Sequence, residues 1–188
     1  MNTTELPTIP TLQTDRLVLR PFSLNDAKVV QKLAGDREIA ATTLLIPHPY
    51  PDGLAEEWIN THSVSFAEGR SINLAITLRE TGELIGAIGL TFHKEYCQAE
   101  LGYWIAAGHW GEGYCTEAAR EMLRYGFEGR NLHRIHAHHF GSNPASGKVM
   151  LKIGMKYEGT LRDHIRKWDR YQDAVFYGML SSEWISDS

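Results

Sequence analysis

The stretch HWGEGYCTEAA, residues 109–119, joins two glycines to the start of an amphipathic segment. It follows an apolar run, 101–107, and a third glycine, Gly108, so the predicted local order is strand, glycine-rich turn and helix. The first amides of a helix have no internal partner and the helix dipole is positive there, which favours a bound anion. Gly111 and Gly113 leave the backbone open to a phosphate. Taken alone, the fragment is equally consistent with a tight turn that needs glycine only for its geometry.

Two common phosphate motifs are excluded at this position. A Walker loop would continue with Gly-Lys-Ser or Gly-Lys-Thr, and neither follows Gly113. A dinucleotide-binding fingerprint needs a parallel strand before the turn and an acidic residue at the end of the next parallel strand. The preceding strand is instead the last of a predicted antiparallel meander, and no acidic residue stands at the required place.

Composition predicts one globular domain over residues 1–188, with 1–11 as an extended lead-in. The chain has 43% hydrophobic residues, enough for a sizeable core, and a formal net charge of −4, which does not favour nucleic acid. Its two cysteines, Cys97 and Cys115, form no CxxC pair, so a reducing compartment fits better than a disulfide framework. Neither a signal peptide nor a membrane span is recognisable. We expect a soluble cytoplasmic protein, a monomer or homodimer, without nucleic-acid or membrane partners.

Hydrophobic periodicity predicts the element order β-α-α-β-β-β-α-β-α-β-β, a mixed α/β domain. Ser23 and Asp26 are expected to cap a helix that runs to Ala34. Asn143 is expected to cap the last helix, with Pro144 at its first position. The predicted strands are 16–22, 72–78, 83–92, 97–106, 133–140, 155–162 and 171–180, and the other predicted helices are near 53–69 and over 114–127.

Two segments carry most of a resemblance to a known family. AELGYWIAAGHWGEGYCTEAAREML, residues 99–123, is followed by a strand and by NPASGKVMLKIGMKYEG, residues 143–159. This arrangement resembles the GNAT superfamily of acetyl-CoA-dependent N-acetyltransferases. It is most similar to the RimJ/RimL-like branch, whose named members acetylate N-termini of ribosomal proteins. The resemblance extends from TDRLVLRPF (14–22) to DAVFYGML (173–180). It implies an α/β GNAT fold, with a mixed, mostly antiparallel sheet of about seven strands and about four helices.

The resemblance assigns the glycine-rich turn to the pyrophosphate of acetyl-CoA. The superfamily's loop is Q/R-x-x-G-x-G/A, which Gly113 matches. Trp110 replaces the usual Gln or Arg, and Cys115 replaces the small Gly or Ala. Both replacements are expected to be tolerated if backbone amides hold the phosphates. The resemblance implies that these amides belong to Gly111, Glu112, Gly113, Tyr114, Cys115 and Thr116.

Further site residues are implied on both sides of the coenzyme. By resemblance, the strand backbone at Trp104, Ile105 and Ala106 would bond the acetyl carbonyl, an oxyanion-hole type of contact. Asn143 would bond the pantetheine arm and Ser146 would protonate the departing thiolate. The plainer interpretation of this NxxS segment is a capping Asn with Ser in the first turn, and both interpretations use the same geometry.

The attacking amine must lose a proton, and the sequence offers no unambiguous base. Glu100, on the strand that by resemblance ends beside the thioester, is the preferred candidate, acting directly or through water. Asp163 and His164, expected in a loop after the sixth strand, are weaker candidates. A free α-amine has a pKa of about 7.7–8.0 and a lysine about 10.4, so a weak base suits an α-amine better.

A metal site and a nucleophilic cysteine are the less favoured interpretations. His136 and His138 share one strand face, but His133 does not, and no Cys or acidic partner stands at a useful spacing. We therefore expect no metal. Cys115 begins a helix but falls on its apolar face, which predicts a packed thiol.

Aromatic residues and three segments are expected to shape the acceptor site. Trp110 and Trp168 are expected to line a substrate cleft, whereas Trp58, Trp104 and Tyr171 are expected in the core or a pocket wall. The segments expected to set specificity are the Pro-rich loop 46–51, the helix after it and the hairpin 162–170.

These observations predict an N-acetyltransferase that uses acetyl-CoA, with the amine attacking the thioester directly in a ternary complex. The preferred acceptor is the α-amine of a protein or peptide. A small amine, such as a polyamine, an amino acid or an antibiotic, is the alternative acceptor. A non-catalytic acyl-CoA-binding sensor is the alternative from another class.

Overall fold

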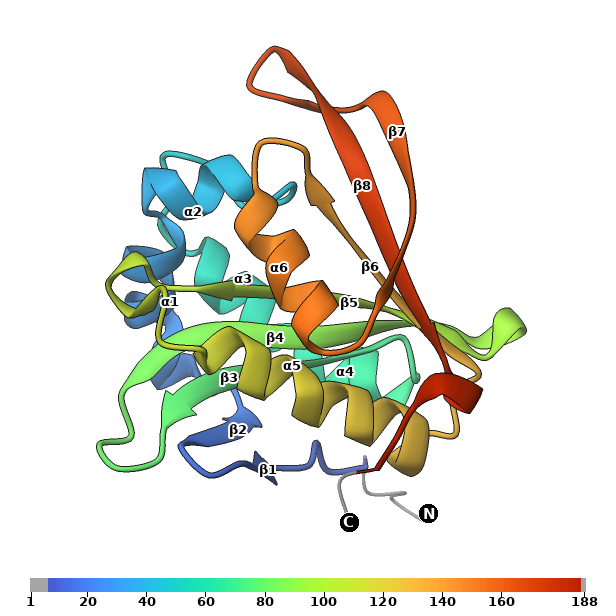
Figure 1. Cartoon of the computed structure of the whole chain (residues 1–188). Coiled ribbons are helices and arrows are strands. Elements are labelled where there is room, and N and C mark those ends of the chain that lie inside the picture. The colour runs from blue at the N-terminus through green and yellow to red at the C-terminus, as the bar shows by residue number, and fades with distance from the viewer. Residues whose placement is uncertain (1–6, 187–188) are drawn as a thin grey trace.

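One eight-stranded sheet organises residues 7–186, the part of the chain that the structure describes. In this computed structural model the strand order is β1-β2-β3-β4-β5-β6-β8-β7 (Figure 1). Only β5 and β6 are parallel neighbours, so the predicted mixed, mostly antiparallel sheet is confirmed. The strands are β1 Leu12–Gln13, β2 Leu17–Pro21, β3 Ser71–Leu78, β4 Leu84–His93, β5 Gln98–Ile105, β6 Arg134–Phe140, β7 Lys156–Lys167 and β8 Arg170–Leu180.

Six α-helices occur among the described residues, two more than expected. One addition, α2, is a short helix whose N-cap is Asp36. The other arises because the helix expected near 53–69 is broken at Thr61, whose hydroxyl and amide both bond to the carbonyl of Trp58. The amide of His62 would need that carbonyl to continue a regular helix. The helices are α1 Ala27–Ala34, α2 Arg37–Thr42, α3 Leu54–Asn60, α4 His62–Ala67, α5 Tyr114–Arg124 and α6 Pro144–Lys152.

Helices cover both faces of the sheet (Figure 1). α5 and α6 pack on one face, and the predicted apolar side of α5 is buried there through Ala118, Ala119, Met122 and Leu123. α1 and α3 cover the opposite face, over a second apolar cluster. The regular part of α5 ends at Arg124, and a π-helical turn, Tyr125–Gly129, completes the segment predicted as helix. None of the helices in residues 7–186 combines the length and apolar character needed to cross a bilayer.

The two parallel strands separate part-way along the sheet, and this separation positions the site. Residues 98–100 of β5 pair with residues 134–136 of β6, and the pairing ends at Glu100 and His136. Both strands continue in the same direction, β5 to Ile105 and β6 to Phe140, without pairing again. Figure 1 shows the two ribbons diverging from this point. An opening between neighbouring strands leaves backbone groups of both strands available to a bound molecule.

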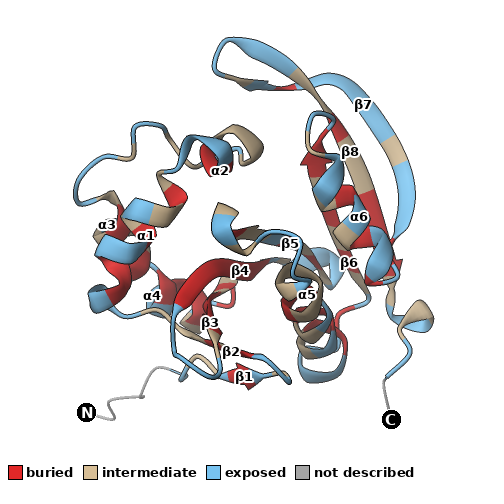
Figure 2. Ribbon diagram, turned by 60° about the vertical axis from the view of Figure 1, so that its left-hand side comes forward, coloured by how far each residue is buried: buried red, intermediate tan, exposed pale blue. Residues whose placement is uncertain are grey.

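The β7–β8 hairpin extends beyond the rest of the sheet. β7 continues to Lys167 rather than ending at 162 as predicted, with an irregular register between Leu161 and Ile165. Asp163 and His164, expected in a loop, therefore lie within this strand. Figure 2 shows β7 largely exposed. A strand exposed on both faces lacks the alternation of apolar and polar residues that identifies strands in a sequence, which explains the shortened prediction.

Candidate active site

A pocket of about 870 Å³ lies where β5 and β6 separate. It runs from the start of α5, past β4 and β5, to the start of α6, and its other end is bounded by α1, α2 and the loop that follows α2. Most of the predicted site residues line it. They are Glu100, Trp104, Ile105, Gly111, Gly113, Tyr114, Cys115, Thr116, Asn143 and Ser146.

The start of α5 has the geometry of an anion site. Gly111 and Gly113 have φ angles of 85° and 82°, a left-handed conformation that explains glycine at both positions. Within residues 7–186, the amides from Gly111 to Thr116 donate no hydrogen bond. These unpaired donors at the positive end of a helix dipole fit a pyrophosphate. Glu112, a predicted site residue, does not line the pocket.

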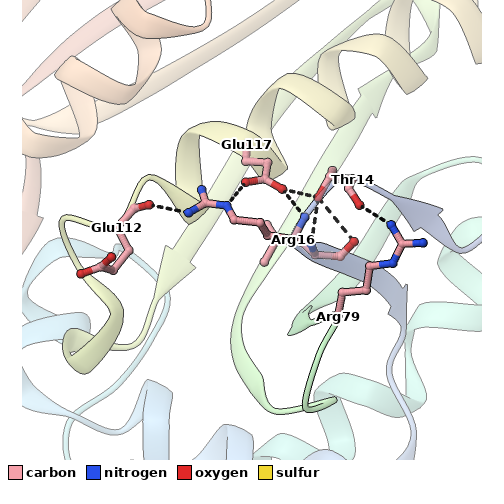
Figure 3. A network of polar contacts seen from close by, with 6 residues as sticks. Thr14, Arg16, Arg79, Glu112 and Glu117 are labelled. Carbon is pink, nitrogen blue, oxygen red and sulfur yellow. Dashed lines mark hydrogen bonds and ion pairs between the residues drawn. The ribbon is translucent and has the colours of Figure 1, made fainter.

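Arg16, which the sequence analysis did not identify, braces this turn (Figure 3). Its guanidinium donates to the Glu117 carboxylate at 2.7 Å and to the Glu112 carbonyl at 3.1 Å, and its Cζ atom lies 4.6 Å from the centre of the Tyr114 ring. Burial opposes ionisation of Glu117, but hydrogen bonds from Thr14 and Arg16 outweigh it and lower the pKa of Glu117. The Arg16 charge thus offsets an acidic side chain that would repel a phosphate at the helix start.

Asn143 and Ser146 adopt the predicted capping geometry at α6. The Asn143 side-chain oxygen accepts from the Ser146 amide at 3.4 Å. Tyr103, on β5, carries no local sequence signal of a site role, yet its hydroxyl lies 2.9 Å from the Ser146 hydroxyl and donates to the Ser146 carbonyl at 3.2 Å. Burial raises the pKa of Tyr103, so this phenol stays protonated at neutral pH. The serine hydroxyl is therefore held at the pocket wall by a residue from another element.

Fewer backbone amides of β5 than predicted are available to bond the acetyl carbonyl. The Ala106 amide donates to the Ile85 carbonyl at 2.8 Å, so the expectation that it bonds the acetyl carbonyl is wrong, and Ala106 does not line the pocket. Antiparallel pairing alternates, which directs the Trp104 amide toward β4 as well. The Ile105 amide faces the other edge, where β5 has separated from β6.

Glu100 lies at the point of separation, against histidines of β6. The Nδ1 atom of His138 is 2.9 Å from its carboxylate, and His136 is its register partner. The contact with His138 lowers the pKa of Glu100 more than burial raises it, and His136 and His93 add to the lowering. The carboxylate is therefore ionised at neutral pH, as a base must be. No acidic residue stands at a useful sequence spacing from these histidines, and it is the sheet register that brings Glu100 against them.

Several predicted candidates lie away from the pocket lining. Trp168, expected in the cleft, stands instead at the tip of the β7–β8 hairpin, where it contacts Arg37. Neither Asp163 nor His164 lines the pocket. Cys115 does line it, but burial raises its pKa to about 12. Its thiol therefore stays protonated, in agreement with the predicted packed thiol and against a nucleophile.

The pocket end opposite α5 is mainly apolar and contains two of the three predicted specificity segments. Ile46, Pro47 and Tyr50 of the Pro-rich loop line it, together with Trp58 of α3. The third segment, the hairpin, reaches this end through Lys167, which donates to the carbonyls of Leu44 and Ile46. Glu100 is the one carboxylate among the residues that line the pocket in the described part of the chain.

A family comparison agrees with this arrangement. Residues 16–156 match the family described as acetyltransferase (GNAT) domain. The chain belongs to the GNAT acetyltransferase family. A crystal structure of a GNAT-family acetyltransferase from Bacillus anthracis superposes on it with a TM-score of 0.82 and 25% identity, over 93% of this chain and 100% of that one. The predicted GNAT fold is confirmed, and with it an acetyl-CoA-dependent acyltransferase.

Relatives of this GNAT chain differ in their acceptors. It is 33% identical over 176 residues to the uncharacterized N-acetyltransferase p20 of Bacillus licheniformis, covering 93% of this chain and 98% of p20. Spermidine N(1)-acetyltransferase of Vibrio cholerae is 28% identical over 92% of this chain and 98% of its own. The [ribosomal protein uS5]-alanine N-acetyltransferase of Escherichia coli is 25% identical over 92% of both chains. The last relative is consistent with the RimJ/RimL-like branch, and the family alone leaves the acceptor open.

Proposed function

We propose that this GNAT chain transfers the acetyl group of acetyl-CoA to the N-terminal α-amine of a protein or peptide, by direct attack in a ternary complex. The observation that carries the proposal is one pocket that joins an unpaired helix start to Ser146 and to a single carboxylate, Glu100. The free cysteines, Cys97 and Cys115, suit a reducing cytoplasm as its compartment.

At the end of the pocket nearest α5, the coenzyme would bind to backbone amides that have no hydrogen-bond partner in the described part of the chain. The amides from Gly111 to Thr116, with the Arg16 charge beside them, would hold the pyrophosphate. The Ile105 amide would bond the acetyl oxygen where negative charge develops in the transition state. Asn143 would contact the pantetheine arm through the part of its amide that the cap does not use.

Proton transfers complete the reaction. The amine nitrogen bonds the acetyl carbon, its proton passes to Glu100 directly or through water, and the carbon–sulfur bond breaks. Ser146 would then donate a proton to the departing thiolate. Each step uses a group that lines the pocket.

The lining of the acceptor end favours an α-amine over a polyamine. A polyamine carries several cationic nitrogens, and each nitrogen buried in a pocket needs an anionic or hydrogen-bonding partner. The lining offers one carboxylate among apolar, aromatic and uncharged polar side chains, so it supplies a single anionic partner, which suits a single amine attached to an uncharged side chain. The uS5-alanine relative supports the same choice, whereas the spermidine relative supports the small-amine alternative.

Paired acceptors test the proposal. We expect thiol release from acetyl-CoA with a peptide that has a free N-terminus and no lysine, and much slower release with a blocked peptide that contains an internal lysine. Spermidine serves as the third acceptor. Faster reaction with spermidine or with the lysine peptide would contradict the proposed acceptor. Coenzyme binding by calorimetry without turnover on any of the three would favour the sensor.

A further inference from the structure

Polar side chains from three strands meet where β5 and β6 separate. His93 ends β4, Glu100 lies on β5, and His136 and His138 lie on β6. Thr91 and His136 are the register partners of Glu100 on its two sides, and His93, two residues after Thr91, shares their face. One ligand atom from each of His93, Glu100 and His136 lies within 4.8 Å of the other two.

An unpaired nitrogen among these ligands is a second, independent observation. The Nδ1 atom of His136 is buried and has no hydrogen-bond partner within residues 7–186. Buried polar atoms are normally hydrogen-bonded, and a neutral imidazole keeps one nitrogen with a free lone pair. The rings of His93 and His136 lie stacked with centres 5.9 Å apart, and one ring nitrogen of each lies within the 4.8 Å spacing of the ligand atoms. Neither His93 nor His136 takes part in the proposed acetyl transfer.

We propose that His93, Glu100 and His136 bind a transition-metal ion of the zinc type, and that the bound ion blocks acetyl transfer. Two imidazoles and a carboxylate are a ligand set that Zn²⁺ accepts, with water completing four-coordination. Bonds of about 2.1 Å place tetrahedral ligand atoms about 3.4 Å apart. His93 is exposed at the end of its strand, so rotation of its side chain closes the remaining distance.

Inhibition follows from the shared carboxylate. A zinc ion on one oxygen of Glu100 withdraws negative charge from the whole carboxylate and so lowers its affinity for the proton of the amine. This consequence rests on the proposed function, whereas the binding of the ion does not. No oxidation is involved, because lone pairs of two nitrogens and one oxygen form the coordinate bonds.

Calorimetric titration of the metal-free full chain with ZnCl₂ tests the binding. We expect one zinc ion per chain, with affinity reduced at least about tenfold in His93→Ala and in His136→Ala, since even outer-shell changes cost about 10–100-fold. His133→Ala is the matched control, an exposed histidine just before β6, and should bind as the unmodified chain does. Mg²⁺ should bind far more weakly, because it prefers oxygen ligands. Equal zinc affinity in both cluster variants would overturn the site.

Two further measurements test the identity of the zinc ligands and the inhibition of turnover separately. The spectrum of the Co²⁺ complex should show tetrahedral nitrogen and oxygen ligation. A thiolate charge-transfer band would instead place the ion on Cys97 and overturn the site. Zinc should stop thiol release reversibly, with recovery by a chelator, and His93→Ala should keep its zinc-free activity and resist zinc. Zinc binding at the cluster with unchanged turnover would overturn the inhibition and count against Glu100 as the base, while leaving the coenzyme site unaffected.

Discussion

The hydroxyl of Ser146 is held by a neighbour 43 residues away in the sequence. The phenol of Tyr103 lies within hydrogen-bond distance of both the hydroxyl and the carbonyl of Ser146. A phenol has one proton, so when it bonds the carbonyl its oxygen accepts from the serine hydroxyl, and when it bonds the hydroxyl the serine proton is free to point elsewhere. The pair therefore offers two arrangements, and only the second presents a proton to a leaving thiolate.

Ser146→Ala should lower kcat far more than the affinity for acetyl-CoA. A general acid acts mainly in the transition state, and its loss typically costs about 10²–10⁴-fold, with a thiolate at the lower end. Tyr103→Phe should give a smaller loss of kcat, because the serine remains but is less well oriented. Ser142→Ala, an exposed serine in the same turn, is the control. Undiminished kcat in Ser146→Ala at saturating substrates would leave Ser146 with only a helix-start role.

Glu100→Gln should slow acetylation of an α-amine at pH 7, toward the lower end of the about 10²–10⁴-fold range of general-base catalysis. The deficit should shrink above the amine pKa of about 8, because the amine then arrives deprotonated. Since the pKa of Glu100 is lowered from 4.5, its carboxylate persists as pH falls and the acid limb of kcat/KM should not reflect its titration above that value. Rates measured from pH 5 to 9, with Glu95→Gln as an exposed control, test this. A deficit that is constant with pH would contradict the role.

At the scale of elements, the turn before α5 combines two left-handed glycines, a helix start and a brace from Arg16, the residue before β2. Arg16 contacts the turn through the Glu112 carbonyl and the first turn of the helix through the Glu117 carboxylate. Glycine at position 113 leaves room for a phosphate and also allows the left-handed backbone conformation. Its φ of 82° would strain a β-branched residue, so Gly113→Val would combine a steric block with backbone strain.

Gly113→Asn is therefore the sharper test of the coenzyme site. Asparagine tolerates the left-handed conformation, and a Cβ at 113 meets only Arg16, at 3.5 Å. The added side chain would obstruct the approach of the phosphate to the backbone amides. We expect acetyl-CoA binding to weaken at least about tenfold, which is about 1.4 kcal/mol, since charge-assisted hydrogen bonds are worth about 1.5–3 kcal/mol each. Gly82→Asn, at φ 72° in the β3–β4 turn with no atom within 4 Å of the added Cβ, is the matched control. Equal calorimetric affinities in the two variants would place the coenzyme elsewhere.

For the molecule as a whole, the face of the sheet covered by α1 and α3 contains an acid-sensitive point. His62 is buried at 5% exposure, and neither ring nitrogen has a hydrogen-bond partner in the described part of the chain. Its ring packs edge-on against Trp58 and Phe22. Burial lowers the pKa of His62 to about 4 from 6.5, because nothing there compensates a positive charge.

This histidine should make the fold less stable as pH falls. The unfolded chain takes up the proton near pH 6.5 and the folded chain only near 4, so stability is lost progressively between these values, by about 3 kcal/mol at pH 4. His62→Phe should remove that loss. The measurement is urea unfolding at pH 7.5 and near pH 4 for the unmodified chain, for His62→Phe and for His133→Phe, an exposed control. The same pH dependence in all three would show that the pKa of His62 does not differ between the folded and the unfolded chain.

The sequence by itself determined the features that depend on neighbours along the chain. Periodicity located seven of the eight strands of the sheet, all but the two-residue β1, and the apolar face of α5. The caps at Ser23 and Asn143 located two helix starts, because these signals arise within a few residues. The glycines before Tyr114 predicted the left-handed turn at the start of α5 for the same reason. The prediction was wrong where such local signals are absent: it ended the exposed strand around Asp163 too early, and it did not include the helix break near Thr61.

Only the tertiary structure decided which side chains meet. Arg16 and Glu117 are 101 residues apart, and Tyr103 and Ser146 are 43 apart, yet each pair is in contact. The strand register places Glu100 against His136 and His138, which turns an isolated carboxylate and a histidine-rich strand into one cluster. Such contacts depend on how the strands pair and where β5 and β6 separate. Both are set by the packing of the whole core, and no window of sequence contains that information.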